Sequence, residues 1–335
     1  MSDIVVVICT YNNASLLDCA LATIGQQELD PSADWSVLVV DNNCTDNTRD
    51  VVQSHIDSGS IPELSVVQES RQGLAYARHR AVRETCAELI AFIDDDCLLD
   101  RAWVQQAVAF FRKHPRAGAV GGKVALLWEA PPDEVLLRHE YSLAKQDHGD
   151  VSRQMPATGV TWLVGASLVV RRSALLASGW LDRMTLIGRR GSVLTAGEDT
   201  EMVLRIRNLG YELWYNPAMR LQHFIPETRM SVDHLCRVRR GSGQSWPVLY
   251  TLGNRLQPNT AVRLHCLAAS VKALGIGFGG ALYRDLLHGR RVSADRKIAL
   301  SGSLGALEGS MRFLFRGCYT QVGLTATRES AASEV

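Results

Sequence analysis

Short apolar runs alternate with longer amphipathic stretches through the first hundred residues, and this alternation restricts the fold more than any other feature. The runs are IVVVICT, WSVLVVD, LSVVQ and LIAFID, and the stretches that follow them are residues 14–27, 46–57, 73–87 and 102–113. Runs that are apolar throughout predict strands buried on both faces. Helices between such strands imply right-handed crossovers in a parallel sheet. We therefore predict a doubly wound α/β domain.

Beyond residue 115 the strict alternation ends, and beyond Met230 helical patterns dominate. We predict a strand at AGAVGGKVALL, an irregular connection over 131–156, a strand and short helix within 162–182, a helix at 199–209, and two strands at YELWYNP and RLQH. Helices are expected at 231–252, 260–288 and 293–315. The chain thus divides into a sheet-containing domain at 1–229, with halves 1–115 and 116–229, a helical extension at 230–318, and a disordered tail at 319–335.

Charge and cysteine usage bear on partners and location. Lys and Arg total 36 against 35 Asp and Glu, for a net charge of +1, so we expect no nucleic-acid partner. The eight cysteines form no C-x-x-C pair, which favours a reduced compartment over disulfides or a zinc site. The N-terminal residues lack the basic flank and length of a secretory signal. We therefore expect a cytoplasmic protein.

The segment from Arg263 to Arg284 is apolar enough to raise the question of a membrane. His265, Lys272 and four glycines interrupt it, so it falls short of a clean span of about 20 apolar residues. We expect an interfacial or packed helix. Peripheral contact with anionic headgroups and a solvated helical face are both open interpretations of the nearby cations. These are Arg284, His288, Arg290, Arg291, Arg296 and Lys297.

Polar loops follow each of the four predicted parallel strands. They read TYNN at 10–13, DNNCTDNT at 41–48, ESRQG at 69–73 and DDDC at 94–97. A single loop of this kind is explained by capping of the next helix. Because the carboxyl ends of parallel strands meet at one edge of the sheet, four such loops together predict a binding site there. The three adjacent carboxylates of Asp94, Asp95 and Asp96 repel one another, so they require a compensating partner such as a cation.

Two common classes of α/β enzyme lack support in the sequence. A dinucleotide-binding dehydrogenase would carry G-x-G-x-x-G after the first strand, where TYNN stands instead. A nucleotidyltransferase would need a glycine- and arginine-rich loop at the same place to hold a triphosphate. That loop is missing too, so this alternative is remote.

Seven separated motifs occur in an order that resembles family 2 glycosyltransferases. They are VICTYNN, VLVVDNNCTDNT, QGLAYARHRAV, LIAFIDDDC, LVGAS, AGEDTEMVLRIRNLGYELWYNP and LQH, within residues 4–229. The resemblance implies a GT-A fold, with 1–115 as the nucleotide-binding half and 116–229 as the acceptor and catalytic half. It implies an inverting hexosyltransferase that moves sugar from a nucleotide-diphosphate sugar to an acceptor hydroxyl, similar to bacterial enzymes of exopolysaccharide and surface-glycan synthesis.

The resemblance also implies a metal site and its ligands. Asp94 and Asp96 match the D-x-D motif, with Asp96 as the direct ligand of Mn²⁺ or Mg²⁺ and Asp95 facing the ribose or the water shell. A divalent cation there would neutralise charge on the departing diphosphate. His223 lies where some members place a further metal or diphosphate ligand, although a structural histidine is an equal alternative.

Several positions are expected around the donor. Asp41 can accept a hydrogen bond from a base or ribose group. Arg71 and Arg78 could reach the base or phosphates, or could instead be surface residues on a helix face. The positions expected to surround the nucleoside or phosphates are Thr10, Tyr11, Asn12, Asp41, Asn42, Arg71, Gln72 and Arg78. Gly165 and Ala166 match the backbone that wraps the donor sugar and acceptor. Trp162 could supply an aromatic platform, but a core position is the favoured interpretation.

The loop LIGRRGSVLTAGED, residues 186–199, carries the predicted catalytic residues. Asp199 matches the general base and Glu198 its supporting neighbour, with helix capping as the competing explanation. We further hypothesise that Gly188 and Gly191 permit a mobile turn. Arg189 and Arg190 would then move onto the diphosphate when donor binds.

Three matters stay open at this point. A catalytically silent nucleotide- or glycan-binding relative is the first rival to an active enzyme, and the nucleotidyltransferase is the second. A UDP-sugar is the expected donor, with guanosine and thymidine sugars as alternatives. The acceptor is a glycan or a lipid-linked oligosaccharide, which would suit contact of the C-terminal helices with the inner face of a membrane.

Overall fold

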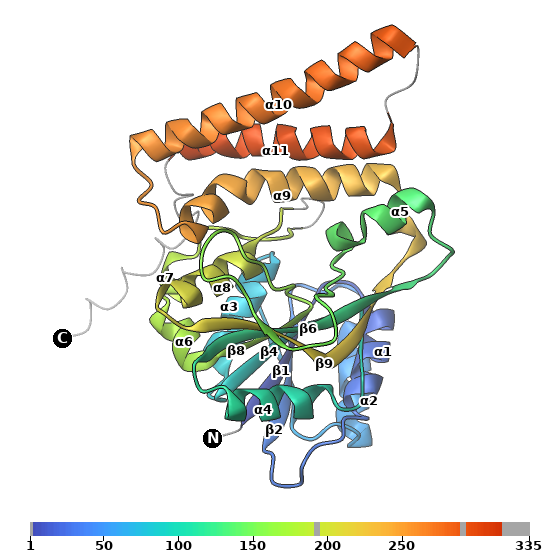
Figure 1. Ribbon diagram of the computed structural model, residues 1–335. Helices are drawn as coiled ribbons and strands as arrows, with labels where there is room; N and C mark the ends of the chain where they lie inside the picture. Colours follow the sequence, from blue (N-terminus) through green and yellow to red (C-terminus); the bar gives the residue numbers. More distant parts are fainter. Residues whose placement is uncertain (1–2, 191–194, 289–292, 317–335) are drawn as a thin grey trace, which may run out of the picture.

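The computed structural model describes residues 3–190, 195–288 and 293–316, except for the side chains of 280–288. Its first half follows the predicted alternation closely (Figure 1). The elements are β1 (Ile4–Thr10), α1 (Ala14–Ile24), β2 (Trp35–Asp41), α2 (Thr48–Ser58), β3 (Leu64–Gln68), α3 (Leu74–Glu84), β4 (Leu89–Asp94), β5 (Cys97–Leu99) and α4 (Trp103–Lys113). The predicted disordered tail, residues 319–335, lies outside the described residues.

Strands β1 to β4 form the parallel part of the sheet. β1, β2 and β4 are largely buried, whereas β3 lies at the edge and is mostly exposed. β1 pairs in parallel with β2 and β4, and β3 adds to β2. Ile4, Val6 and Ile8 pack on the side of α1, α2 and α4, whereas Val5 and Val7 pack against α3 and later helices on the other side. Because both sides are covered, the strand must be apolar at every position, as the sequence has it.

The second half adds strands of mixed direction. Its elements are β6 (Ala117–Trp128), α5 (Glu134–Arg138), a 3₁₀ turn (Glu140–Leu143), β7 (Arg153–Gln154), β8 (Ser167–Arg171), α6 (Arg172–Ala177), α7 (Trp180–Arg183), α8 (Glu198–Asn208) and β9 (Glu212–Ile225). The strand order is β3-β2-β1-β4-β8-β6-β9-β5, with β7 beside β9. β8 runs antiparallel to both β4 and β6. The sheet is therefore mixed, with the predicted parallel arrangement confined mainly to its first half.

One strand replaces the two that were predicted at YELWYNP and RLQH. β9 continues through both segments and pairs with β6, with a shift of register where Gly122 faces Asn216 and Lys123 faces Arg220. Pro217 lies in the shift, and a proline has no N–H to donate to a neighbouring strand. The sequence pattern therefore indicated a real interruption of the pairing between β6 and β9, but the pairing resumes beyond it within the same strand.

The C-terminal helices form layers above the sheet domain. They are α9 (Val232–Gly253), which follows a short 3₁₀ turn (Glu227–Arg229), then α10 (Thr260–His288) and α11 (Ala294–Arg316). Figure 1 shows α9 next to the domain, α11 over α9 and α10 outermost. Contrary to our expectation, Thr260–Gly279 is long and apolar enough to cross a membrane by length and composition, with a mean hydropathy of 1.3. It is the one such helix in the described part of the chain.

Candidate active site

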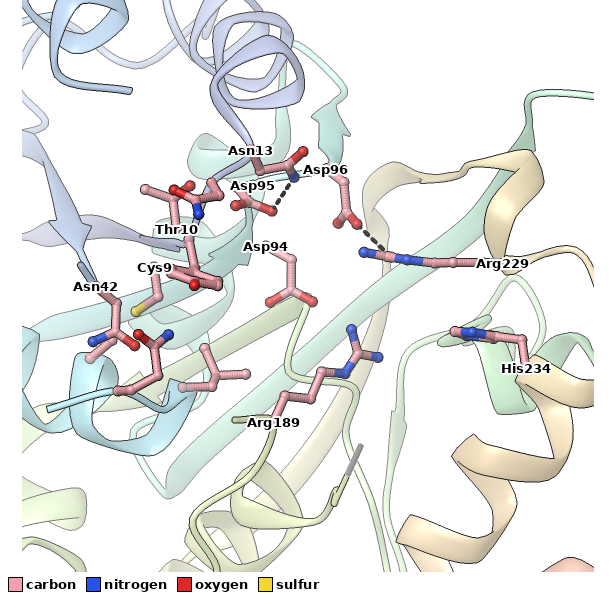
Figure 2. Close-up of a pocket in the computed structure, with 15 residues that line it drawn as sticks. Cys9, Thr10, Asn13, Asn42, Asp94, Asp95, Asp96, Arg189, Arg229 and His234 are labelled. Atoms are coloured by element: carbon pink, nitrogen blue, oxygen red, sulfur yellow. Dashed lines mark hydrogen bonds and ion pairs between the residues drawn. The ribbon is translucent and has the colours of Figure 1, made fainter. Parts of the chain in front are cut away.

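A cleft of about 330 Å³ lies at the carboxyl edge of the parallel strands. The polar loops after β1, β2 and β4 meet there, as the strand-end argument predicted. Figure 2 shows the acidic triplet on one side, with Arg189, Arg229 and His234 opposite it. The lining residues are Cys9, Thr10, Tyr11, Asn12, Asn13, Asn42, Gln72, Leu74, Ala77, Asp94, Asp95, Asp96, Arg189, Arg229 and His234.

Asp94, Asp96 and His223 form a group that could hold a metal ion. Each offers one ligand atom, and these atoms lie within 4.8 Å of one another. The topology explains the meeting, because β5 follows the triplet directly and pairs antiparallel with β9, which sets Cys97 opposite His223. Asp96 therefore lies beside a histidine that is 127 positions away in the chain, by the difference of their numbers.

The histidine of this group is oriented as a metal ligand should be. Its Nδ1 lies 3.1 Å from the carbonyl oxygen of Leu143, an outer contact of the kind that fixes the tautomer of a ligating histidine. Its Nε2 lies 3.1 Å from Oδ1 of Asp96. This nitrogen is buried and makes no well-directed hydrogen bond with the described residues. Carboxylates with one imidazole suit Mn²⁺ better than Mg²⁺, which prefers oxygen.

Asp96 is ionised although it is buried. Arg229 donates to its Oδ2 at 2.8 Å. Burial alone would raise the pKa of Asp96, but the charges of His223 and Arg229 outweigh it and hold this pKa well below its ordinary value. The carboxylate is therefore ionised, with His223 and Arg229 as the cations that face its two oxygens.

Asp95 has a different environment from its neighbours. It accepts a hydrogen bond from Nδ2 of Asn13 at 2.8 Å and is not one of the three grouped ligands. Burial, together with the negative charge of Asp96, raises the pKa of Asp95 to about 7. The three aspartates together therefore carry less than three negative charges near neutral pH, which reduces the repulsion between them.

Arg78 connects the acidic triplet with the predicted catalytic pair. It is buried, and its guanidinium lies 3.5 Å from Asp94 and 3.2 Å from Glu198. Burial disfavours the charged arginine, but Glu198 and Asp94 outweigh this effect and raise its pKa. Burial and the charge of Asp199 raise the pKa of Glu198 to about 7, against the lowering effect of Arg78. Arg78 is thus a buried part of the site, not a surface arginine.

Asp199 is half-buried at the start of α8. The backbone N–H of Gly165 donates to its Oδ2 at 2.9 Å, and the N–H of Thr200 donates to its Oδ1 at 2.6 Å. A side chain at position 165 would meet Arg78 and Asp199 at 3.0 Å or less. Glycine is therefore required where the backbone before β8, continuing into Ala166, passes the carboxylate.

The structure separates the predicted nucleoside contacts into two groups. Thr10, Tyr11, Asn12, Asn42 and Gln72 line the cleft. Of the other three, Arg78 lies between Asp94 and Glu198 as described above, and Asp41 and Arg71 have other partners. Asp41 is buried and accepts from the N–H of Cys44 at 2.7 Å and from Arg49 at 2.9 Å, whereas Arg71 pairs with Glu69. Both hold the loops in shape and neither lines the cleft.

The described part of the loop before Glu198 is docked on α3. The carbonyl oxygens of Ile187 and Arg189 accept from the N–H groups of Ala75 and Leu74. Gly188 has φ +74°, and a side chain there would meet Glu198 at 2.6 Å, so glycine is required. Arg189 lines the cleft and Arg190 is exposed. Gly191 lies outside the described residues, and the closing motion stays a hypothesis.

Two features of the site differ from the sequence analysis. Trp162 is 53% exposed, so the core position favoured for it was wrong. Asn13, Arg229 and His234 line the cleft and were not predicted. Arg229 and His234 flank the start of α9, and a single sequence gives no signal that this helix begins at the edge of the sheet.

The mixed sheet, its flanking helices and the acidic cluster at the carboxyl edge of its strands form the arrangement of the GT-A fold. The family described as Glycosyl transferase family 2 matches residues 5–174, and the chain belongs to this family. This confirms the predicted family and enzyme class over the nucleotidyltransferase alternative.

Solved structures confirm the fold. A mannosyltransferase from Pyrobaculum calidifontis, in complex with GDP-Man and Mn²⁺, aligns with a TM-score of 0.53 at 19% identity, over 94% of this chain and 88% of that one. TarS of S. aureus, as a fragment of residues 1–349, aligns with a TM-score of 0.50 at 12% identity, over 93% of this chain and 91% of the fragment.

Curated relatives include several glycosyltransferases. A glucosyl-dolichyl phosphate glucuronosyltransferase of Haloferax volcanii is 27% identical over 69% of this chain and 72% of its own length. A pre-mycofactocin glycosyltransferase of Mycobacterium tuberculosis is 24% identical over 93% of this chain, and a validoxylamine A glucosyltransferase of Streptomyces hygroscopicus is 37% identical over 36% of it. The chain aligns with only 62% and 25% of the lengths of the last two.

Proposed function

We propose that this glycosyltransferase moves a sugar, with inversion, from a nucleotide-diphosphate sugar to an acceptor hydroxyl, and that it requires Mn²⁺ or Mg²⁺. The observation that carries the proposal is the meeting of Asp94, Asp96 and His223 within 4.8 Å. Two of the three belong to a triplet that lines a cleft of suitable size for a small ligand. The Mn²⁺ and GDP-Man bound by the P. calidifontis enzyme support the same ligand classes here.

The acidic residues of the cleft suit the metal ion of a metal-bound diphosphate, and its arginines suit the phosphate groups. A divalent cation on the acidic side would neutralise the charge that develops on the leaving diphosphate. Arg189 and Arg229 also line the cleft and offer guanidinium donors for phosphate oxygens, and Arg229 donates to Asp96 as well. Thr10, Asn12 and Asn42 line the remainder and are proposed to bind the nucleoside.

Asp199 is the proposed general base. The acceptor hydroxyl forms a bond to the anomeric carbon, the bond from that carbon to the diphosphate breaks, and the hydroxyl proton passes to the Asp199 carboxylate. Two backbone N–H groups and the Thr200 hydroxyl orient this carboxylate. Its Oδ2, which accepts from Gly165, keeps a second lone pair for the proton. Glu198 is paired with Arg78, so we assign it to positioning. Trp162, exposed three residues before Gly165, is proposed to stack on the acceptor.

The substrates are proposed only by class. A UDP-sugar is the expected donor, with a GDP-sugar as the alternative that the P. calidifontis complex favours. The Haloferax relative is named for a dolichyl-phosphate-linked sugar, which supports a lipid-linked acceptor in surface-glycan or exopolysaccharide synthesis. Such an acceptor would place the enzyme in the cytoplasm, at the inner face of a membrane.

The base assignment is tested with Asp199→Asn. We expect transfer to fall by roughly 100-fold to 10,000-fold, the usual contribution of a general base, while binding of nucleotide diphosphate with Mn²⁺ is unchanged in calorimetry. Asp50→Asn, which alters an exposed aspartate of α2, is the control and should transfer normally. Full transfer by Asp199→Asn would contradict the assignment. Nucleotide binding without any transfer by the wild type would favour the catalytically silent alternative.

A further inference from the structure

The outermost helix of the molecule is covered on one side only. α10 lies on α11, with the Ser270 and Ser310 hydroxyls 2.8 Å apart and Arg263 over the ring of Phe313 at 5.7 Å. Figure 1 shows no element on the other side of α10 in the described part of the chain. Only 11% of the apolar segment Thr260–Gly279 is buried. A core helix of the same composition would be mostly buried.

The open side of α10 carries an apolar stripe. Leu264, Val271 and Phe278 recur at a spacing of seven residues and are 51%, 54% and 54% exposed. Ala268 and Gly275 lie between them at helical spacing and are exposed as well. Soluble monomers rarely expose a contiguous apolar patch of this kind, so the stripe requires a partner.

The charges of this layer indicate the nature of the partner. Thr260–Gly279 contains no Asp or Glu, and its charged groups are Arg263 and Lys272. The two carboxylates of the described part of α11 are paired away from α10. Asp295 pairs with Arg138, and Glu308 pairs with Arg240 of α9. Within Thr260–Gly279, an apolar stripe with cations beside it and no anions fits a surface of anionic lipid better than a protein of mixed charge. The next acidic residue of α10 in the sequence is Asp285.

The packing distinguishes a helix that lies on a membrane from one that crosses it. Thr260–Gly279 is long enough to cross, but this segment is held against α11 by contacts at Arg263, Ser270 and Gly277. α11 is in turn packed so closely on α9 that a side chain at Gly305 would meet the Arg240 carbonyl at 2.0 Å. α11 also carries Lys297, Glu308 and Arg312, which are costly in a bilayer. A crossing would have to break this stack, so α10 is suited to lie flat.

We propose that α10 binds the surface of bilayers that contain anionic lipids, with Leu264, Val271 and Phe278 inserted among the headgroups and Lys272 at the level of the phosphates. The inference goes beyond the transfer reaction and holds whichever sugar is moved. α9, which lies beneath α11, carries His234 of the cleft in its first turn. The anchor would therefore hold the cleft at a fixed distance from a lipid surface.

The test is sedimentation of the full chain with vesicles of phosphatidylglycerol and phosphatidylcholine, and with vesicles of phosphatidylcholine alone. We expect binding to the anionic vesicles and its loss at high salt, because headgroup attraction is screened. Val271→Glu/Phe278→Glu should weaken binding by at least about tenfold, since two apolar contacts become anions. Lys272→Gln should weaken it by about fivefold, the usual effect of one cation near an anionic surface.

Val151→Glu is the matched control, because Val151 is 77% exposed and lies in the sheet domain. It should bind vesicles as the wild type does. Sedimentation does not depend on the proposed reaction, and all variants should also keep wild-type hydrolysis of the donor. Failure of the wild type to bind anionic vesicles would overturn the proposal. So would undiminished binding by Val271→Glu/Phe278→Glu, or a lipid-free dimer that these substitutions dissociate, since a second copy would then cover the stripe.

Discussion

Arg78 shows how one buried side chain can connect two acidic loops that are far apart in the sequence. Asp94 ends β4 and Glu198 begins α8, and Arg78 lies between them from α3. A buried carboxylate without a partner is costly, so each of the three charges depends on the others. The planar guanidinium reaches both carboxylates at once, which a lysine cannot do in the same geometry.

His234 makes stability depend on pH. Burial, with the charges of Arg229, Arg237 and Arg189, lowers its pKa from 6.5 to about 4. As the pH falls from 6.5 toward 4, the unfolded chain takes up a proton at this ring and the folded chain does not, so the ring reduces stability toward acid. His234→Gln has no such proton. We expect the melting temperature of the variant, relative to wild type, to rise as the pH is lowered through this range, and a constant difference would contradict the assignment.

Site residues that directly follow a strand are easier to predict from the sequence than site residues that distant segments of the chain contribute. Asp94 to Asp96 were predicted as site residues because three adjacent carboxylates after a buried strand favour a cation, and all three line the cleft. Asp41 was found by the same rule, yet its oxygens accept from Cys44 and Arg49, and only the folded loop reveals those partners. Arg229 and His234 could not be found, because their place depends on where α9 begins in space.

At the scale of elements, α9 and α11 pack through glycines. A side chain at Gly305 would meet the Arg240 carbonyl at 2.0 Å, and one at Gly309 would meet the Gln244 carbonyl at 2.1 Å. Such contacts let two helix backbones approach closely. The lengths of the helices were predictable from the periodicity of the sequence. The packing of α11 on α9 as well as on α10 was not predictable, because the glycines of these helices would allow close packing in more than one combination.

Gly305→Ala tests this packing against a matched substitution. The added carbon collides with backbone, so we expect a loss of roughly 1–3 kcal/mol in unfolding free energy, or more if the helices separate. Gly275→Ala makes the same change in α10, where nothing lies within 4 Å of the added carbon. It should stabilise by up to about 1 kcal/mol through helix propensity. Urea unfolding followed by circular dichroism measures both, and equal effects would contradict the packing.

At the scale of the whole molecule, the boundary that we predicted near residue 230, between the sheet-containing domain and the helical extension, passes through the cleft. Arg229 lies on one side of it and His234 on the other, and both line the same space as the aspartates. The doubly wound layout was predictable because buried strands read as continuous apolar runs. The mixed second half was not, since its pairings join distant segments and leave no local pattern. We propose that the helical extension is part of the active site and that its removal would impair donor binding.

The central claim is that Asp96, with Asp94 and His223, holds a divalent cation that donor binding requires. The most direct measurement is calorimetric titration of a nucleotide diphosphate with and without Mn²⁺ into wild type, Asp96→Asn and Asp34→Asn, the last an exposed aspartate at the opposite end of the strands. We predict that Mn²⁺ tightens binding to wild type and Asp34→Asn, and that Asp96→Asn loses this gain. Binding that is equally tight after chelation, or in Asp96→Asn with Mn²⁺, would contradict the claim.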